Sequence, residues 1–316
     1  TANLDVVDID GAVDMASTLA VAGVLTGASL DISGDIDIDG TSNLDIVDVD
    51  GAVNFAADVT YADGADIITA SAGTSNVRFG VNAGNSIASG GNYNVVVGDE
   101  AGTAITTGDG NVAVGYQALD SNTTGTENSA FGKAALAGNT TASGNAAFGT
   151  FSANSNTTGT GNAAFGGATP GVTNATLMSN TTGNYNTAIG IAALAANTTA
   201  DNNTAVGYSA LIANTTGTRN VALGAEALEA NTTANDNTAV GYQALEAATT
   251  GGENTAMGNY SLKANTTGTN NVAIGDQALE ANTTAANNTG VGYRALEANT
   301  TGAYNAAFGA NALDAN

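Results

Sequence analysis

Three aspartates near the start of the chain are spaced like the first ligands of a calcium loop. Asp35, Asp37 and Asp39 alternate with isoleucines, and oxygens at alternate positions converge on Ca²⁺ in such loops. The pattern continues with Gly40, but the glutamate required at its twelfth place is Ile46 here. The alternative is that these carboxylates face water from the outer sides of short strands, and the missing glutamate favours it. The aspartates are therefore candidate calcium ligands, and no other metal or cofactor is expected.

Catalytic residues are not expected anywhere in the chain. It contains no histidine and no cysteine, so the commonest general base and the thiolate nucleophile are both missing. The sequence at residues 207–209, Gly-Tyr-Ser, matches the start of the G-x-S-x-G nucleophile elbow of hydrolases. A serine in that place needs a base to accept its proton, and no histidine exists to do so. The sequence predicts that the protein is not an enzyme.

Four tyrosines recur at the same place in a sequence repeat and are candidate surface contacts. They are Tyr116, Tyr208, Tyr242 and Tyr293. An exposed row of aromatic rings could stack against sugars, because each ring offers an apolar face beside a polar hydroxyl. The alternative is that the rings pack in an interface with another protein chain, where tyrosine is also enriched. The second interpretation is the stronger one from the sequence.

Many Asn-Thr-Thr triplets, such as residues 122–124, carry a second hypothesis. They match the acceptor pattern for N-glycosylation, but in a bacterial or phage protein ladders of stacked Asn and Thr are the stronger interpretation. The threonine pairs at 123–124, 215–216 and 232–233 recur at the repeat spacing, and a flat solenoid face with regularly spaced threonines could match an ice lattice. Because adjacent residues of a strand point to opposite faces, only one threonine of each pair could line such a plane.

These residues are positioned by a repeat that fills most of the chain. From Asn76 onward the pattern is Asn, usually a small or β-branched residue, usually Ala, an apolar residue, and Gly. We number its positions 1 to 17 from the Asn. Successive glycines at position 5 lie seventeen positions apart, except for one interval of eighteen and one of twenty-four. They are Gly80, Gly98, Gly115, Gly132, Gly149, Gly166, Gly190, Gly207, Gly224, Gly241, Gly258, Gly275, Gly292 and Gly309.

The repeat predicts an all-β fold, a parallel β-solenoid with 17-residue coils. A constant period in a long chain is typical of stacked coils. A unit of this length, rich in Thr, Asn and Gly, is too short and too poor in helix formers for a pair of helices. We expect fourteen coils over residues 76–316, with structural ladders that include Asn203, Gly207, Asn220, Gly224, Asn237 and Gly241.

The asparagines at position 1 are expected at corners, in left-handed backbone. Residues 277–281 are expected as a strand or bent turn, and 167–178 as an external loop.

Residues 1–75 are expected to form a separate, acidic and β-rich segment. They hold 14 of the 29 acidic residues and no Lys or Arg. Residues 3–15 return almost unchanged as residues 43–55, which indicates a duplication. Apolar residues alternate there with Asp and end at Asp-Gly pairs, a pattern typical of short strands joined by tight turns.

Both faces of the repeated strand lack solvating residues. Positions 2 and 4, which are mostly Val, Thr, Ile and Phe, share one face, while Asn, Ala and Gly at positions 1, 3 and 5 share the other. A strand buried on both sides needs a second layer on each. One face is therefore expected to line the coil and the other to meet a partner chain, and the sequence does not tell which. We predict a homotrimer of parallel chains.

Charge and hydropathy exclude other partners. The formal charge of −24 opposes nucleic-acid binding, which needs Lys and Arg to displace counterions. No apolar run approaches the roughly 18 residues that span a bilayer, so membrane insertion is not expected. Because the chain begins at Thr1, we expect a processed or partial product.

The pentapeptide at residues 271–275, Asn-Val-Ala-Ile-Gly, resembles the head repeat of trimeric autotransporter adhesins. The longer unit, with its Ala-Leu and Asn-Thr-Thr, resembles arrays in phage tail-fibre proteins that carry an endosialidase-type chaperone. The resemblance covers residues 76–316 and implies a trimeric, extracellular or virion-borne fibre, without a heptad stalk, membrane anchor or chaperone in this sequence. We expect a structural or adhesive fibre, as a phage tail-fibre shaft or receptor-binding fibre. The alternatives are a bacterial trimeric adhesin and a self-assembling extracellular filament subunit, with a cell-surface glycan or protein as receptor.

Overall fold

The computed structural model describes residues 72–168 and 174–315. This part of the chain contains fourteen β-strands of three residues each and no helix. The strands are β1 (Val77–Phe79), β2 (Val95–Val97), β3 (Val112–Val114), β4 (Ser129–Phe131), β5 (Ala146–Phe148), β6 (Ala163–Phe165), β7 (Thr187–Ile189), β8 (Thr204–Val206), β9 (Val221–Leu223), β10 (Thr238–Val240), β11 (Thr255–Met257), β12 (Val272–Ile274), β13 (Thr289–Val291) and β14 (Ala306–Phe308). Each strand occupies positions 2 to 4 of one repeat.

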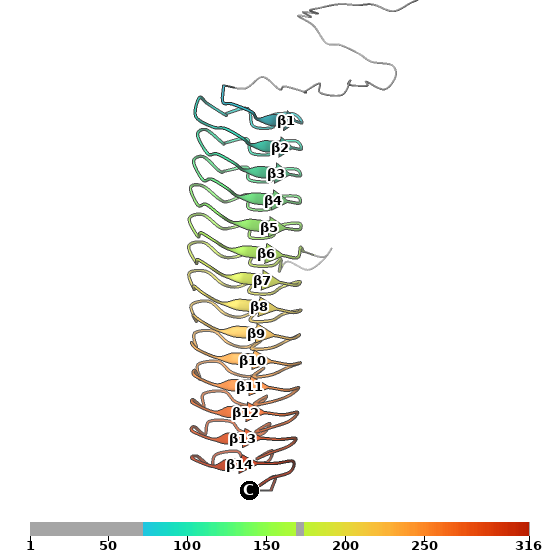
Figure 1. Cartoon of the computed structure of the whole chain (residues 1–316), viewed down its shortest axis with the longest axis vertical. Coiled ribbons are helices and arrows are strands. Elements are labelled where there is room, and N and C mark those ends of the chain that lie inside the picture. The colour runs from blue at the N-terminus through green and yellow to red at the C-terminus, as the bar shows by residue number, and fades with distance from the viewer. Residues whose placement is uncertain (1–71, 169–173, 316) are drawn as a thin grey trace, which may run out of the picture. The chain divides into compact units, whose positions relative to one another are not determined.

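All fourteen strands form one parallel sheet in sequence order. Equivalent positions pair from coil to coil, so that Thr204 lies beside Val221 and Val221 beside Thr238. Figure 1 shows the result, a stack in which each coil lies flat on the one before. The predicted parallel β-solenoid with 17-residue coils is confirmed, with about thirteen turns between β1 and β14.

The glycines at position 5 form a column at the corner where each strand ends. Their φ angles, such as 139° at Gly207 and 141° at Gly224, are outside the range that side chains tolerate. A Cβ added to Gly224 would lie 2.6 Å from the carbonyl carbon of Gly241 in the next coil. Glycine is therefore required twice over, by the backbone angle and by the approach of the neighbouring coil.

The asparagines at position 1 lie inside the solenoid rather than in left-handed corners. Asn203, Asn220 and Asn237 are fully buried. The backbone N–H of Asn220 donates to Oδ1 of Asn203 at 3.0 Å, and the same oxygen accepts from Nδ2 of Asn220 at 3.2 Å. The left-handed residue is instead the one before each asparagine, as at Arg219, where φ is 58°. The asparagine is needed because its amide satisfies buried backbone groups of two coils.

A second buried asparagine ladder runs along position 12. Nδ2 of Asn214 donates to Oδ1 of Asn197 at 3.1 Å and to the carbonyl of Gly217 at 3.0 Å. The ladder is interrupted where Ala248 takes the place of asparagine. Oδ1 of Asn231, in the coil before, is consequently buried with no hydrogen-bond partner.

Small apolar side chains fill the rest of the interior. The core consists of Ala at positions 3 and 8 and Leu at position 9, such as Ala239, Ala244 and Leu245, all fully buried. Leu245 has φ of 54° and Gln243 has φ of 52°, so positions 7 to 9 form a tight left-handed bend. Residues 277–281 belong to such a bend and are neither strand nor helix. The expectation of an external loop over residues 167–178 is wrong for its last part, because Ala175, Thr176 and Leu177 are fully buried and Leu177 occupies the position 9 site of the core. Residues 169–173 of that loop, and almost all of the acidic segment (residues 1–71), lie outside the described residues.

Candidate functional site

We call positions 2 and 4 of β1–β14 the outer sheet face, which is largely apolar. Position 4 is apolar in every strand, whereas position 2 is Val, Ala, Thr or Ser. Positions 1 and 3 point inward, so the alternation of the strand turns the larger apolar residues outward. Phe165 remains 40% exposed and Leu223 47% exposed. None of these positions in the described strands carries a charge, although the chain as a whole has 29 acidic residues. The sequence did not show which face of the strand lines the interior. In the structure, Asn at position 1 and Ala at position 3 point inward.

Three phenylalanines in neighbouring coils form a continuous ridge on this face. The rings of Phe131 and Phe148 stack with centroids 4.8 Å apart and an interplanar angle of 7°. Phe148 and Phe165 repeat the arrangement at 4.8 Å and 6°. The parallel register sets this distance, because equivalent side chains of adjacent coils lie one strand spacing apart. The ridge adds three large aromatic side chains to the apolar surface of the outer sheet face, with Phe131 36% and Phe165 40% exposed.

The four predicted tyrosines lie at position 6, just past the glycine corner, and are 41 to 57% exposed. They do not form an unbroken row. Ala225 separates the coils of Tyr208 and Tyr242. Tyr242 meets Tyr260 edge to face instead, with ring centroids 5.5 Å apart. The corner therefore presents separate rings rather than one flat platform.

The three side chains of each Asn-Thr-Thr triplet lie in different environments. The asparagine amide is buried in the second ladder, so N-glycosylation in the folded chain would have to break it. The first threonine bonds along the stack, as where Oγ1 of Thr215 donates to the carbonyl of Thr232 at 3.1 Å. The second threonine is exposed in every coil from β2 to β13, at Thr107, Thr124, Thr141, Thr158, Thr182, Thr199, Thr216, Thr233, Thr250, Thr267, Thr284 and Thr301.

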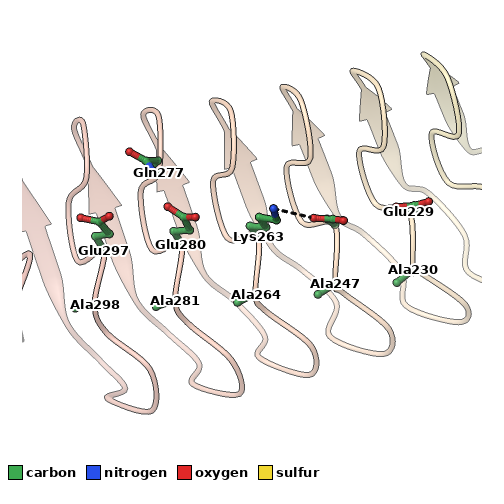
Figure 2. Close-up of a pocket in the computed structure, with 11 residues that line it drawn as sticks. Glu229, Ala230, Ala247, Lys263, Ala264, Gln277, Glu280, Ala281, Glu297 and Ala298 are labelled. Carbon is green, nitrogen blue, oxygen red and sulfur yellow. Dashed lines mark ion pairs between the residues drawn. The ribbon is translucent and has the colours of Figure 1, made fainter.

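A groove of about 750 Å³ runs along five coils on another side of the solenoid. Its floor is a row of alanines at position 11, from Ala230 to Ala298, and its rim is a row of longer side chains at position 10 (Figure 2). The rim contains Glu229, Glu246, Glu280 and Glu297, with Lys263 between them, and Nζ of Lys263 lies 3.4 Å from Oε2 of Glu246. This groove was not predicted, and aligning positions 10 and 11 of successive repeats would have shown it.

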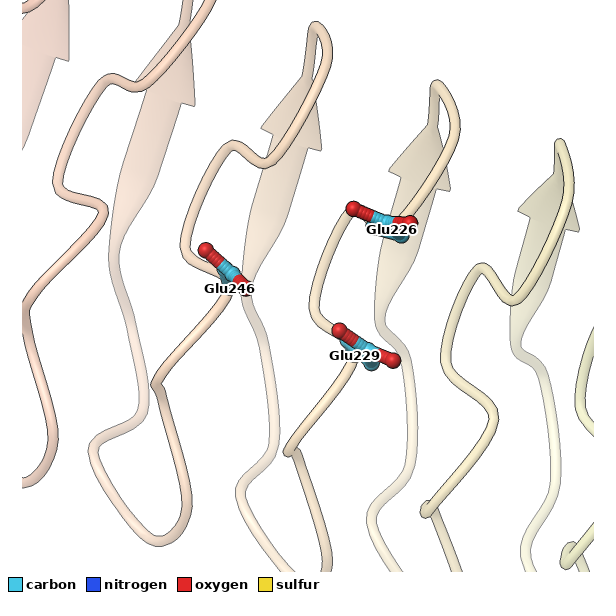
Figure 3. A group of neighbouring side chains, drawn as sticks. All are labelled: Glu226, Glu229 and Glu246. Atoms are coloured by element: carbon cyan, nitrogen blue, oxygen red, sulfur yellow. The ribbon is translucent and has the colours of Figure 1, made fainter.

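Three carboxylates meet at one end of the groove. Glu226 and Glu229 come from one coil and Glu246 from the next (Figure 3), with oxygens within 4.8 Å of one another. Burial and the charges of Glu226 and Glu246 raise the pKa of Glu229. Nε2 of Gln243 donates to Glu226 at 2.6 Å, so the cluster already has polar partners. Such oxygens suit a hard divalent cation chemically, but exposed acidic groups of this kind are common without one.

The candidate calcium ligands Asp35, Asp37 and Asp39 lie outside the described residues. Among the residues that the structure does describe, Ser209 is buried and its elbow is an ordinary glycine corner of the repeat. The described coils also contain no apolar helix of membrane-spanning length.

No known protein family, curated protein or solved structure matches this chain.

Proposed function

We propose that the protein is a structural or adhesive fibre element that works as a homotrimer of parallel solenoids. The outer sheet face carries this proposal: an uncharged apolar surface of fourteen strands that a single chain leaves partly exposed. Burying such a surface is favourable by about 25 cal/mol for each Å² removed from water. A trimer gives every chain the same partners on that surface and closes the assembly.

The role that follows is a shaft or receptor-binding fibre, most simply in a phage tail or on a bacterial surface. A stack of coils joined by continuous hydrogen-bond ladders resists axial deformation and makes a spacer roughly 65 Å long at about 4.8 Å per coil. The exposed tyrosines of position 6 are the candidate contacts for a surface glycan or protein receptor. A bacterial trimeric adhesin and a self-assembling extracellular filament subunit are the alternatives.

Electron microscopy of the purified chain separates these roles. Discrete rods of uniform length support a fibre element, whereas filaments that lengthen with protein concentration support the filament subunit. Small globular particles without a rod would contradict both. Glycan-array binding that is lost in Tyr208→Ala and Tyr242→Ala, but kept in Tyr260→Phe, would assign the receptor contact to the position 6 corner.

A second candidate, ice binding, is favoured by one observation. The exposed threonines at position 14 form a column over twelve consecutive coils, and none of their hydroxyls bonds to another described residue. The neighbouring column at position 16 weakens this candidate, because it is chemically mixed and its side chains bond to one another, as Thr126 does to Ser143 at 3.2 Å. Thermal hysteresis that falls on Thr216→Tyr would support ice binding, and its absence in the unmodified protein would exclude it.

A further inference from the structure

Side-chain volumes on the outer sheet face are matched within thirteen of the fourteen strands. Where position 4 is phenylalanine, position 2 is small, as in the pairs Ser129 with Phe131, Ala146 with Phe148, Ala163 with Phe165 and Ala306 with Phe308. In β2, β3 and β7–β13, position 2 is Thr or Val and position 4 is Val, Ile, Leu or Met. β1, with Val77 and Phe79, departs from this rule.

Matched volumes indicate a packed surface. A face that meets only water has no need to keep the combined volume of two side chains constant, because solvent fills any shape. A face held at a fixed distance from another surface does need it, since voids and overpacking are both destabilising. The outer sheet face therefore has the composition of one half of an interior.

The occupant that fits this face is a second copy of the same chain. A partner must be uncharged and largely apolar over fourteen strands and must repeat every 4.8 Å, the distance at which the phenylalanines stack. The outer sheet face itself has both properties. This step rests on the proposed homotrimer, and it adds how the copies find their register.

Two copies of such a repetitive face could pair in several registers along the stack. Every position 4 is apolar, so a shift of one whole coil between two copies loses few contacts, as in any strand whose pattern repeats. A shifted contact also cannot close into a ring, since a closed cyclic trimer allows no displacement along its axis. Shifted pairs would instead grow into open assemblies. Some feature must mark one level of the stack.

We propose that β4–β6 are that mark. Phe131, Phe148 and Phe165 form the only three-coil phenylalanine ridge on the described face, and Ser129, Ala146 and Ala163 form a trough beside it. The ridge of one copy lies in the trough of the next. A shift of one coil drives a phenylalanine ring against Val112 or Thr187, which are too large for the trough. The copies therefore associate parallel and with equivalent coils level.

Disulfide trapping tests the register directly, because the chain has no cysteine of its own. A disulfide needs Cβ atoms about 3.5 to 4.5 Å apart, which distinguishes adjacent coils. A chain that carries Thr238→Cys is refolded together with a second chain that carries Val240→Cys, in the same coil. In two further mixtures the second chain carries Leu223→Cys or Met257→Cys, in the coils on either side. We expect the same-coil heterodisulfide to exceed each of the others by on the order of tenfold.

A second variant removes the phenylalanine ridge of β4–β6 and the trough beside it. Phe131, Phe148 and Phe165 become Val while Ser129, Ala146 and Ala163 become Thr, which makes β4–β6 like Thr204 and Val206 of β8. Off-register disulfides should then rise to the same-coil level, with larger and polydisperse species. A control with Thr204→Val, Val206→Ile, Thr289→Val and Val291→Ile should keep the original preference. If the six changes prevent folding, the pair Ala146→Thr and Phe148→Val alone is used.

The outcomes separate this inference from the proposed function. Trimers that show no same-coil preference, or that keep it when the mark is erased, overturn the register role of β4–β6 and leave the fibre proposal standing. A protein that remains monomeric in light scattering overturns the homotrimer, and the register role falls with it. A same-coil preference that disappears with the mark supports both.

Discussion

Ala248 is the residue at which the second asparagine ladder is broken. Replacing it with asparagine would supply the missing donor to Oδ1 of Asn231 and an acceptor for the amide of Asn265. A buried unsatisfied polar group costs about 1 to 3 kcal/mol, so Ala248→Asn should stabilise the solenoid by a similar amount. The checks are the thermal midpoint and amide hydrogen exchange in the coils of β9–β11.

The adjacent substitution Ala247→Asn is the matched control, because Ala247 lies at the groove floor outside the ladder. It should leave the free energy of unfolding within about 0.5 kcal/mol of the parent. A lower midpoint for Ala248→Asn than for this control would show that the interior has no room for the amide and would contradict the ladder account.

The glycine column gives the opposite prediction. Gly224→Ala combines a φ of 141° with a Cβ placed 2.6 Å from the Gly241 carbonyl carbon, so it should destabilise the fold by about 3 kcal/mol or more. Gly144→Ala is the control, since Gly144 has φ of 70° and open space around it. Its cost should be about 1 kcal/mol. Equal urea midpoints for the two variants would argue against close coil stacking.

At the scale of the strand, a charge placed on the outer sheet face should separate association from folding. Leu223→Asp changes a side chain that one chain leaves 47% exposed, so the far-UV spectrum should stay unchanged. In the proposed trimer the carboxylate would be buried without a partner, at a cost of several kcal/mol. Sedimentation should show an association constant lower by on the order of 100-fold.

Thr233→Asp introduces the same charge at position 14, away from the outer sheet face, and should leave association unchanged. Dissociation by both variants would point to general repulsion between acidic chains. Dissociation by neither would remove the outer sheet face as the interface.

The groove makes a prediction about pH. The pKa of Glu229 is raised in the folded chain by burial and by Glu226 and Glu246, so the folded state holds this proton more tightly than the unfolded state. Its protonation therefore favours folding, and that contribution is lost as pH rises through the raised pKa. Glu229→Gln should stabilise the protein at pH 7, by less than about 1 kcal/mol because solvent screens the site. The gain should vanish near pH 4 in thermal melts, and a gain independent of pH would contradict this cause.

The sequence predicted the coil and its period, because Asn and Gly at positions 1 and 5 have few structural alternatives. It could not predict which strand face is the interior, since Ala and Asn on one side and Val and Phe on the other are both compatible with burial. The answer depends on the position 9 leucines, such as Leu245, which share the buried core with the position 3 alanines. A Cβ added at Gly290, the position 3 residue of β13, would lie 3.3 Å from Cγ of Leu279 in the coil before, so the leucines occupy the space beside position 3 and leave no room for phenylalanine. Leu245 occupies that space through a left-handed backbone, with φ of 54°, which leucine propensity opposes.

The candidate contacts were predicted in part. The positions of the tyrosines follow from the repeat. Only one threonine of each pair is exposed, as expected, but the pairs lie in bends outside the strands, so strand alternation is not the cause. The acidic groove escaped notice because Glu and Ala at positions 10 and 11 read as an isolated turn in one repeat. The groove exists only when Glu229, Glu246, Glu280 and Glu297 are aligned along the stack.

At the scale of the whole solenoid, a thin interior is combined with a large apolar exterior. A typical coil buries one leucine and two or three alanines, with polar ladders between them. Hydrophobic burial within one chain is therefore small for the length of backbone that is ordered. The proposed association through the outer sheet face would supply the missing burial and would account for the absence of charge among its residues.

The native mass tests this central claim most directly. Multi-angle light scattering of the purified chain, over a hundredfold dilution range, should give three times the chain mass of 30.6 kDa. Circular dichroism on the same samples should report β structure throughout. A folded species with the mass of a single chain that persists at all concentrations would contradict the account, because the outer sheet face would then be stable in water on its own.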